Sequence, residues 1–470
     1  MKKQRIFSIA LAAFLSIGCL GACSGGGNDS VVSQADPNEK AEIEFYVWAE
    51  KALCEEIADS FETIYPNWKV KVTLATSDYY QSLQTYSGAN IMPDIFYMQP
   101  GYISDFCRDR LLLNLQPYLD AGEDLTKEDL WTLNDSYRYD TQTEKLGSGD
   151  LYAYIKDFTP EFMMIYNKSH IDEYNETHDV SLAAEVGYPT DDGVYPSTTK
   201  SMSWSQNERM CRLLSKFDNN GNFTRYGSNF GFEPWSHLGE FVSQLGGTMF
   251  NADGYMNADS PEMIAALEHL KNYMDGENAS SVKIGSSVVN DGMGFRNGDI
   301  SVLFTGRWAF QQYDWDNAEF DIGVAPAAMP EAEQETKMVS AMVGIAISAE
   351  SKYPAVAYKF VEYYMTYGQK LLSKKGFNIP GNKTIAYKDY VDTGDAEVDE
   401  LNAYFLSMVD KCEMVEVNPW LDYGSIGTVY GMELSRAWGT ADRLTAAQAL
   451  LAAKSTIDTK VDQNKNRYGN

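Results

Sequence analysis

Residues 42–74 read EIEFYVWAEKALCEEIADSFETIYPNWKVKVTL. The β-rich run at 42–48 precedes apolar side chains that recur at helical spacing from 53 to 64, before Pro66. Residues 68–74 then alternate apolar with polar side chains, which predicts a strand with one exposed face. The stretch therefore predicts a β-α-β unit, and such a unit opens an α/β lobe.

Further elements follow along the chain. Residues 93–98 predict a third strand, and the apolar aromatic runs 151–154 and 162–166 predict the start of a second lobe. Ser260-Pro261 and Pro354 are helix start signals. The remaining predicted elements are short strands at 321–324 and 343–347 and a final helix at 444–457. No repeat of fixed period is seen.

Composition narrows the class of protein. The chain has 470 residues, of which 44% are hydrophobic and 13% aromatic, so core material is ample and a small disulfide scaffold is excluded. Acidic residues outnumber basic ones 67 to 38, for a net charge of −29. This charge argues against a nucleic-acid partner and suits a soluble body. We expect a monomer.

The first residues have the layout of a secretory signal. Lys2, Lys3 and Arg5 precede an apolar run at 6–20, which is too short for a confident membrane-spanning helix. Small residues and Cys23 follow this run. We therefore expect residues 1–22 to be a cleaved signal peptide and the protein to be exported.

The end of this segment, Leu20-Gly21-Ala22-Cys23, resembles the bacterial lipobox. The resemblance implies that Cys23 becomes a diacylated N-terminus, and two acyl chains anchor a protein stably to a bilayer. Residues 23–39 then form a flexible tether to the extracytoplasmic face of the membrane. The alternative is an ordinary signal peptide in which Cys23 is incidental.

Neither the other cysteines nor the acidic segment 218–222 has the spacing of a metal site. The four cysteines of the body are too widely spaced for a short metal-binding pair, and they are either disulfides or buried thiols: Cys54, Cys107, Cys211 and Cys412. Residues 218–222, DNNGN, lack the glycine position and the distal Glu of a calcium loop, so a surface turn is expected there. We expect no metal and no organic cofactor.

Several segments, taken in order, resemble the extracellular solute-binding proteins, family 1, of ABC importers, which include maltose-binding protein. Each segment is weak by itself, but their order and spacing span most of residues 41–460. The segments are 43–48, 93–96 (PDIF), 151–153, 165–168 (IYNK), 295–299 (FRNGD), 306–308 (GRW), 344–348 (GIAIS), 357–360 and 376–380 (GFNIP).

This resemblance implies two α/β lobes with crossover hinge strands and a ligand held between the lobes. The chain is expected to cross near 153–161, 310–321 and 365–375. The implied lobes are 40–155 with 310–365, and 156–309 with 366–470. Closure of the lobes would present a bound sugar to the ABC permease, whose ATPase is a separate subunit.

A sugar needs flat aromatic platforms and planar polar side chains. In the first lobe, Trp48 and Glu50 end the opening strand, and Gln99 and Tyr102 follow the third strand. Open α/β sheets bind ligands at this carboxyl edge. Asp94 serves either the ligand or a strand turn.

In the second lobe, the resemblance assigns Glu233 and Trp235 to the sugar, the first accepting hydroxyl protons and the second stacking. It also assigns Arg307 and Trp308 of the G-x-W turn, and Trp308 is the best stacking candidate in the chain. Trp420 lies where the family has a late aromatic segment, although the alignment is loose there.

Two other classes stay open. A secreted glycoside hydrolase also combines aromatic platforms with acids, but no local signature selects two catalytic carboxylates. A surface adhesion lipoprotein would share the anchor without needing a cleft. We expect a binding protein without catalytic residues, in which an elaborated loop at 175–203 shapes specificity.

Overall fold

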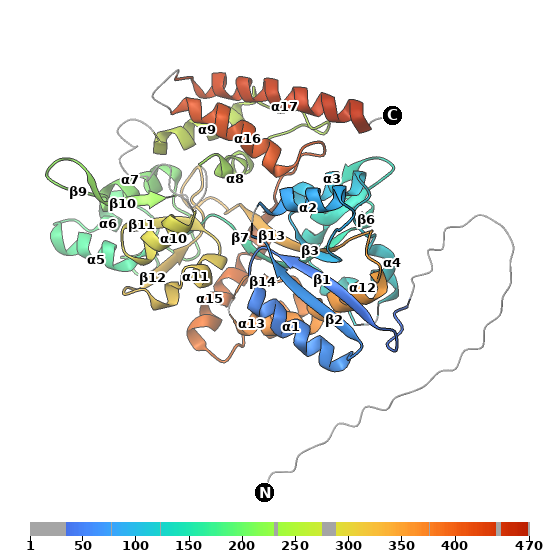
Figure 1. The fold of residues 1–470 in the computed structure, drawn as a ribbon. Coiled ribbons are helices and arrows are strands. Elements are labelled where there is room, and N and C mark those ends of the chain that lie inside the picture. The colour runs from blue at the N-terminus through green and yellow to red at the C-terminus, as the bar shows by residue number, and fades with distance from the viewer. Residues whose placement is uncertain are drawn as a thin grey trace, which may run out of the picture.

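The computed structural model describes most of the chain, and it shows two lobes (Figure 1). In the described residues no helix is both long enough and apolar enough to cross a membrane. The signal peptide, Cys23 and most of the tether lie outside these residues. The described ranges are 34–76, 78–122, 124–229, 234–274, 288–375, 377–438 and 443–468.

A seven-stranded sheet forms the first lobe, in the order β14-β7-β13-β3-β1-β2, with β15 beside β13. Strand β1 is parallel to both β2 and β3, whereas β13 is antiparallel to β3 and β7. The strands are β1 (Ala41–Val47), β2 (Trp68–Leu74), β3 (Ile95–Met98), β7 (Ala153–Pro160), β13 (Met338–Ile347), β14 (Ile379–Pro380) and β15 (Cys412–Met414).

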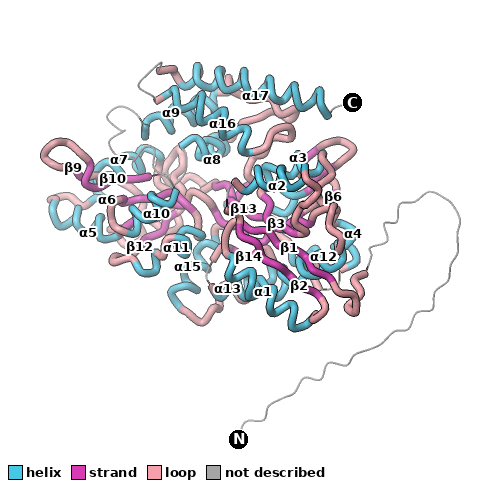
Figure 2. The backbone as a smooth tube through the Cα atoms, in the orientation of Figure 1, coloured by secondary structure: helices cyan, strands magenta, loops and turns pink. Residues whose placement is uncertain are grey.

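The predicted β-α-β unit is confirmed. Helix α1 (Lys51–Ile64) joins β1 to β2 and buries Ile57 and Phe61 at its predicted spacing. Strand β2 buries alternate side chains, so one face is exposed as expected. Helices α2 (Tyr79–Gly88), α3 (Ile103–Arg108) and α12 (Pro354–Tyr363) also belong to this lobe (Figure 2).

The second lobe has a five-stranded sheet in the order β12-β8-β11-β10-β9. Its strands are β8 (Met163–Asn167), β9 (Lys216–Phe217), β10 (Phe223–Asn229), β11 (Ile300–Thr305) and β12 (Ile322–Ala325). Its helices include α5 (Lys168–Thr177), α7 (Trp204–Leu214), α8 (Leu238–Gln244), α9 (Pro261–Met274), α10 (Val288–Arg296) and α11 (Trp308–Gln312). Helices α16 (Tyr423–Glu433) and α17 (Ala446–Tyr468) pack against each other and, through α17, on α9 (Figure 1).

The chain passes from the first sheet to the second through Glu161 and Phe162, which lie between β7 and β8. Phe162 has a left-handed backbone, with φ at 59°. The return differs from the expected 310–321, because β12 pairs with β8 of the smaller sheet and the larger sheet is reached only at β13. Strand β14 also belongs to the larger sheet. The residue limits of the lobes stay a prediction.

Two smaller expectations are settled here. The four body cysteines are free thiols, and three of them are buried. Residues 218–222 form a turn in which the Asp218 carboxylate accepts the backbone N–H groups of Asn220 and Asn222. No group of three potential metal-ligating side chains is found among the described residues.

Candidate ligand-binding site

Four predicted residues gather at the carboxyl edge of β1 and β3. The indole ring of Trp48 lies 5.1 Å from Tyr97 and 6.3 Å from Tyr80, centroid to centroid. Tyr80 stacks on Tyr102, and its hydroxyl accepts the backbone N–H of Gln99 at 2.7 Å. The fourth residue, Glu50, accepts a hydrogen bond from the Tyr97 hydroxyl at 3.2 Å. This edge therefore combines aromatic rings with a carboxylate and an amide.

A buried ammonium group positions Glu50. Lys156, on the crossover strand β7, places its Nζ 2.7 Å from Glu50 Oε2 and also pairs with Asp157. Asn378 donates to the second Asp157 oxygen at 3.1 Å. Burial raises the pKa of Glu50, and the Lys156 charge opposes this shift. One cation thus compensates two carboxylates at the end of β1.

Backbone strain occurs at the same place. Glu50 precedes α1 with φ at 59°, a left-handed conformation that a non-glycine residue rarely adopts. The contacts with Lys156 and Tyr97 hold this conformation. The position of the Glu50 carboxylate is therefore set by tertiary contacts.

Trp308 and Glu161 form the second group. The Trp308 indole N–H lies 3.3 Å from each Glu161 carboxylate oxygen, and Trp308 remains partly exposed. A Cβ at Gly306 would lie 2.7 Å from Glu161 Oε2, so the G-x-W turn needs its glycine to approach this carboxyl. Burial raises the pKa of Glu161 to about 8.

Two predicted residues are turned away from these groups. Asp94 lies at the amino end of β3, where its oxygens accept from the Glu44 backbone N–H at 2.8 Å and the Ser351 hydroxyl at 2.5 Å. Both of its oxygens are thus engaged by the first lobe, and the choice between ligand and strand turn stays a prediction. Arg307 is 2% exposed and donates from Nε to Asn402 at 3.2 Å. Neither side chain is brought to the aromatic edge.

Trp420 lies at a contact between the lobes. The Arg108 guanidinium, from α3, lies 4.8 Å from the Trp420 ring centroid and donates to the Pro419 carbonyl. A Cβ at Gly254 would lie 2.8 Å from the Trp420 ring, so the indole is packed on that side as well. This ring is occupied by protein contacts.

Tyr423 reaches the aromatic edge instead. A Cβ at Gly101 would lie 2.4 Å from the Tyr423 ring, whose centroid is 6.2 Å from Tyr102. Glu233 lies outside the described residues, as does the side chain of Trp235. Sequence reasoning missed Tyr80, Lys156, Glu161 and Tyr423. Glu161 could have been found, because it ends the predicted crossover segment.

The two lobes joined by crossover strands, and the aromatic edge at the ends of β1 and β3, are the features of a two-lobed binding protein. The family model described as bacterial extracellular solute-binding protein matches residues 42–370. The chain therefore belongs to this family, as the sequence segments suggested. No curated protein sequence matches the chain.

Solved structures of similar fold are numerous. An ABC substrate-binding protein of Listeria monocytogenes in complex with cycloalternan has a TM-score of 0.72 and 22% identity, over 90% of this chain and 99% of that one. A maltose/maltodextrin-binding domain of Bdellovibrio bacteriovorus bound to maltotriose has a TM-score of 0.68 and 17% identity, over 90% and 100%. A solute-binding protein of Thermotoga lettingae bound with α-D-tagatose has a TM-score of 0.69 and 16% identity, over 90% and 100%.

The raised pKa of Glu161 predicts a pH-dependent stability. The unfolded side chain loses its proton near pH 4.3, whereas the folded one keeps it up to about pH 8. Between these values the folded state binds more protons, so the free energy of unfolding falls as pH rises, by about 1.4 kcal/mol per unit from this group. Glu161→Gln should remove this fall of unfolding free energy with pH, as measured by urea unfolding from pH 5 to 9.

The control is Glu335→Gln, which changes an exposed carboxylate and should keep the wild-type pH dependence. If Glu161→Gln also keeps it, Glu161 is not the group responsible.

Removal of the buried ammonium gives a second prediction. Lys156→Met leaves the carboxylates of Glu50 and Asp157 without their cation, and we expect a loss of about 3–5 kcal/mol in unfolding free energy at pH 7. Lys71→Met breaks the exposed pair with Glu44 and should cost at most about 1 kcal/mol. Equal losses of unfolding free energy in the two variants would show that Lys156 does not stabilise the buried carboxylates.

Proposed function

We propose that the protein captures a carbohydrate, an oligosaccharide, between its two lobes and delivers it to the permease of an ABC importer. The observation that carries the proposal is the aromatic and carboxylate edge formed by Trp48, Glu50, Tyr80 and Tyr102 in a chain of the solute-binding family. Pyranose rings bind by stacking on aromatic faces and by hydrogen bonds from their hydroxyls.

The second wall of this site comes from the other lobe. Trp308 supplies an indole ring, and its bond to Glu161 fixes the ring's orientation. Glu233 and Trp235 are proposed to complete this wall on the basis of the family resemblance. Sugar complexes of the three proteins of similar fold support carbohydrate as the class of ligand.

In this mechanism nothing chemical happens to the ligand. The short β7–β8 connection and the return between β12 and β13 act as the hinge. Contacts that the sugar makes with both walls exist only when the lobes are closed, so binding shifts the population towards the closed form. The permease recognises this form. We infer that the chain has no catalytic role and acts as a monomer.

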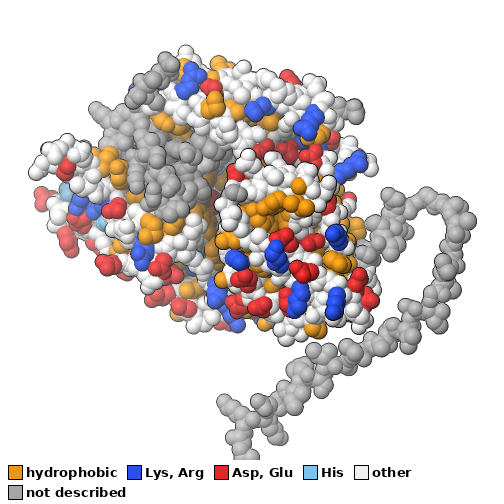
Figure 3. Space-filling model, in the orientation of Figure 1, with side chains coloured by type: hydrophobic (Ala, Val, Ile, Leu, Met, Phe, Trp, Pro, Cys, Tyr) orange, Lys and Arg blue, Asp and Glu red, His pale blue; other side chains and the backbone are white. Residues whose placement is uncertain are grey.

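The proposed anchor is the diacylated Cys23, which holds the body at the extracytoplasmic face of the bacterial membrane. Residues 23–39 leave the lobes free to turn towards the permease. The acidic chain is suited to this place, because its net negative charge keeps it soluble, and many Asp and Glu side chains lie on the face seen in Figure 3.

Binding is tested with a panel of mono- and oligosaccharides in a thermal-shift assay, followed by calorimetry on the best ligand. A ligand that binds only the native form raises the melting temperature. Trp308→Ala should weaken binding about tenfold or more, because a stacked ring is worth about 1.4 kcal/mol or more. Trp438→Ala, a partly buried indole at the end of η9 (Leu434–Ala437), is the matched control and should keep wild-type affinity.

Recovery of the sugar separates the alternatives. A receptor returns the ligand unchanged, whereas a glycoside hydrolase produces new reducing ends. If no sugar of the panel raises the melting temperature, the proposal is wrong and an adhesion lipoprotein is favoured.

The anchor has its own test. Cys23→Ala should move the protein from the membrane fraction to the soluble exported fraction of expressing cells, since the acyl chains supply the membrane affinity. Cys54→Ala, which alters a buried thiol of the body, should stay with the membrane. Unchanged fractionation of Cys23→Ala would exclude the lipid anchor.

A further inference from the structure

One arginine of the first lobe is enclosed by residues of the second lobe. The side chain of Arg108, at the end of α3, is 3% exposed. Its guanidinium carbon lies 4.8 Å from the ring centroid of Trp420 and 5.5 Å from that of Tyr468, the last residue of α17. The guanidinium also donates to the Pro419 carbonyl. Figure 1 shows α3 close to the end of α17, as these contacts require.

Each half of this contact is fixed to its own lobe. In the first lobe, Asp105 of α3 accepts from Arg108 Nη1 at 2.6 Å and so orients the guanidinium. In the second lobe, the Trp420 carbonyl accepts from the Asn464 side chain of α17 at 2.7 Å. Helix α17 itself packs on α9. The contact therefore joins two surfaces that move with their lobes.

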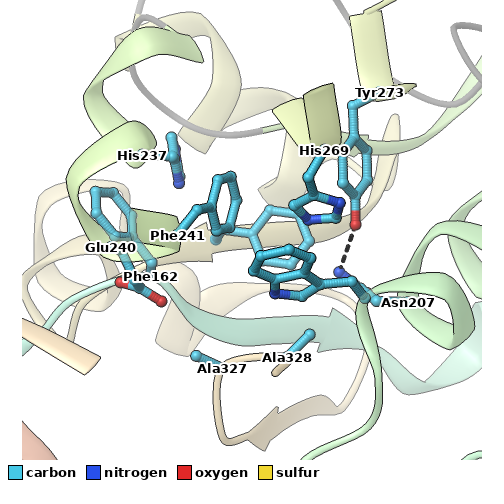
Figure 4. A pocket seen from close by; sticks show the side chains of 11 residues that line it. Phe162, Asn207, His237, Glu240, Phe241, His269, Tyr273, Ala327 and Ala328 are labelled. Atoms are coloured by element: carbon cyan, nitrogen blue, oxygen red, sulfur yellow. Dashed lines mark hydrogen bonds between the residues drawn. The ribbon is translucent and has the colours of Figure 1, made fainter. Parts of the chain in front are cut away.

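The pivot between the lobes lies elsewhere in the chain. Glu161 donates its backbone N–H to β13 of the first sheet. Phe162, the next residue, packs its ring 3.9 Å from that of His237 in the second lobe, centroid to centroid (Figure 4). Each connecting residue is thus attached to a different lobe. Rotation between them separates α3 from the C-terminal segment, so the Arg108 contact breaks and forms as the lobes move.

The chemistry of this contact favours the closed arrangement. A guanidinium is attracted to the face of an aromatic ring, most strongly to Trp and where water is excluded. A hydrogen bond from a charged donor is about twice as strong as a neutral one. The Tyr468 hydroxyl adds a contact with the Asp109 carboxylate at 3.3 Å. Since the rings that enclose Arg108 belong to the other lobe, all of these contacts are lost when the lobes separate.

We propose that Arg108, Trp420 and Tyr468 form a latch that holds the two lobes together before any sugar is bound. The inference goes beyond carbohydrate capture, because none of the latch contacts involves a ligand. A latch of this kind raises the fraction of protein in the closed form, on which the apparent affinity for a ligand depends. It also slows the entry of a ligand, because the lobes must first separate.

The test is small-angle X-ray scattering of the full chain, purified without sugar. The wild type should scatter as the arrangement of lobes in Figure 1. Arg108→Ala should raise the ratio of open to closed forms about tenfold or more, so that the open form predominates and the radius of gyration rises. Tyr468→Ala should produce a smaller rise. Arg110→Ala, which removes an exposed arginine of the same lobe, should scatter like the wild type.

Binding kinetics give a readout that a merely structural role would not change. With the best sugar of the panel, Arg108→Ala should weaken the affinity and at the same time speed association, because more of the protein is already open. Loss of a direct sugar contact would weaken the affinity without faster association.

Two scattering results would overturn the proposal: a wild type that is open without sugar, or a double variant Arg108→Ala, Tyr468→Ala that scatters like the wild type. If the variants with Arg108→Ala do not fold, Tyr468→Ala at the end of the last helix decides by the same measurement. If no sugar of the panel binds, carbohydrate capture fails, and scattering alone still decides the latch.

Discussion

The connection between the lobes constrains everything else, because only Glu161 and Phe162 separate a strand of one sheet from a strand of the other. Glu161 donates its backbone N–H to Val339 at 3.0 Å, so the outgoing crossover is tied to the strand that follows the return. Arg307 donates its backbone N–H to the Thr159 hydroxyl at 3.0 Å. The G-x-W turn is thereby fixed to the hinge, and the orientation of Trp308 follows from that contact.

Charge is treated differently at the surface and inside. Most acidic residues are solvated, but three acids near the hinge are buried. The cost of burying a carboxylate is offset in two different ways. Asp157 shares the Lys156 ammonium with Glu50, which keeps a charged network at the end of β1. Glu161 and Glu240 have no such cation among the described residues, and burial shifts their pKa values upwards. The first lobe therefore holds an ion-paired carboxylate at its edge, whereas the two buried carboxyl groups of the second lobe keep their protons to higher pH.

Aromatic rings connect these regions. Tyr423 of α16 crosses to Gly101 and Tyr102, and Trp420, just before α16, meets Arg108. Tyr468 of α17 also contacts Arg108, so the C-terminal segment touches the first lobe in several places. Tyr423 therefore lies at the start of α3, and Trp420 lies at its end. A sugar that stacks at Tyr102 would thus be placed beside a residue of the other lobe, which is the arrangement that couples binding to the relative position of the lobes.

The sequence by itself determined the β-α-β opening and the gathering of Trp48, Glu50, Gln99 and Tyr102. Strand and helix periodicity are local properties, and parallel strands end at one edge of a sheet, so these residues could be placed without knowing the rest of the chain. Only the tertiary structure decided which polar and aromatic side chains were already occupied. Asp94 is bound by Ser351, Arg307 by Asn402 and Trp420 by Arg108, each partner lying far away in the chain. Likewise, Lys156 and Tyr423 reach the aromatic edge from distant segments. Such pairings arise from packing between lobes, and no local pattern of residues encodes them.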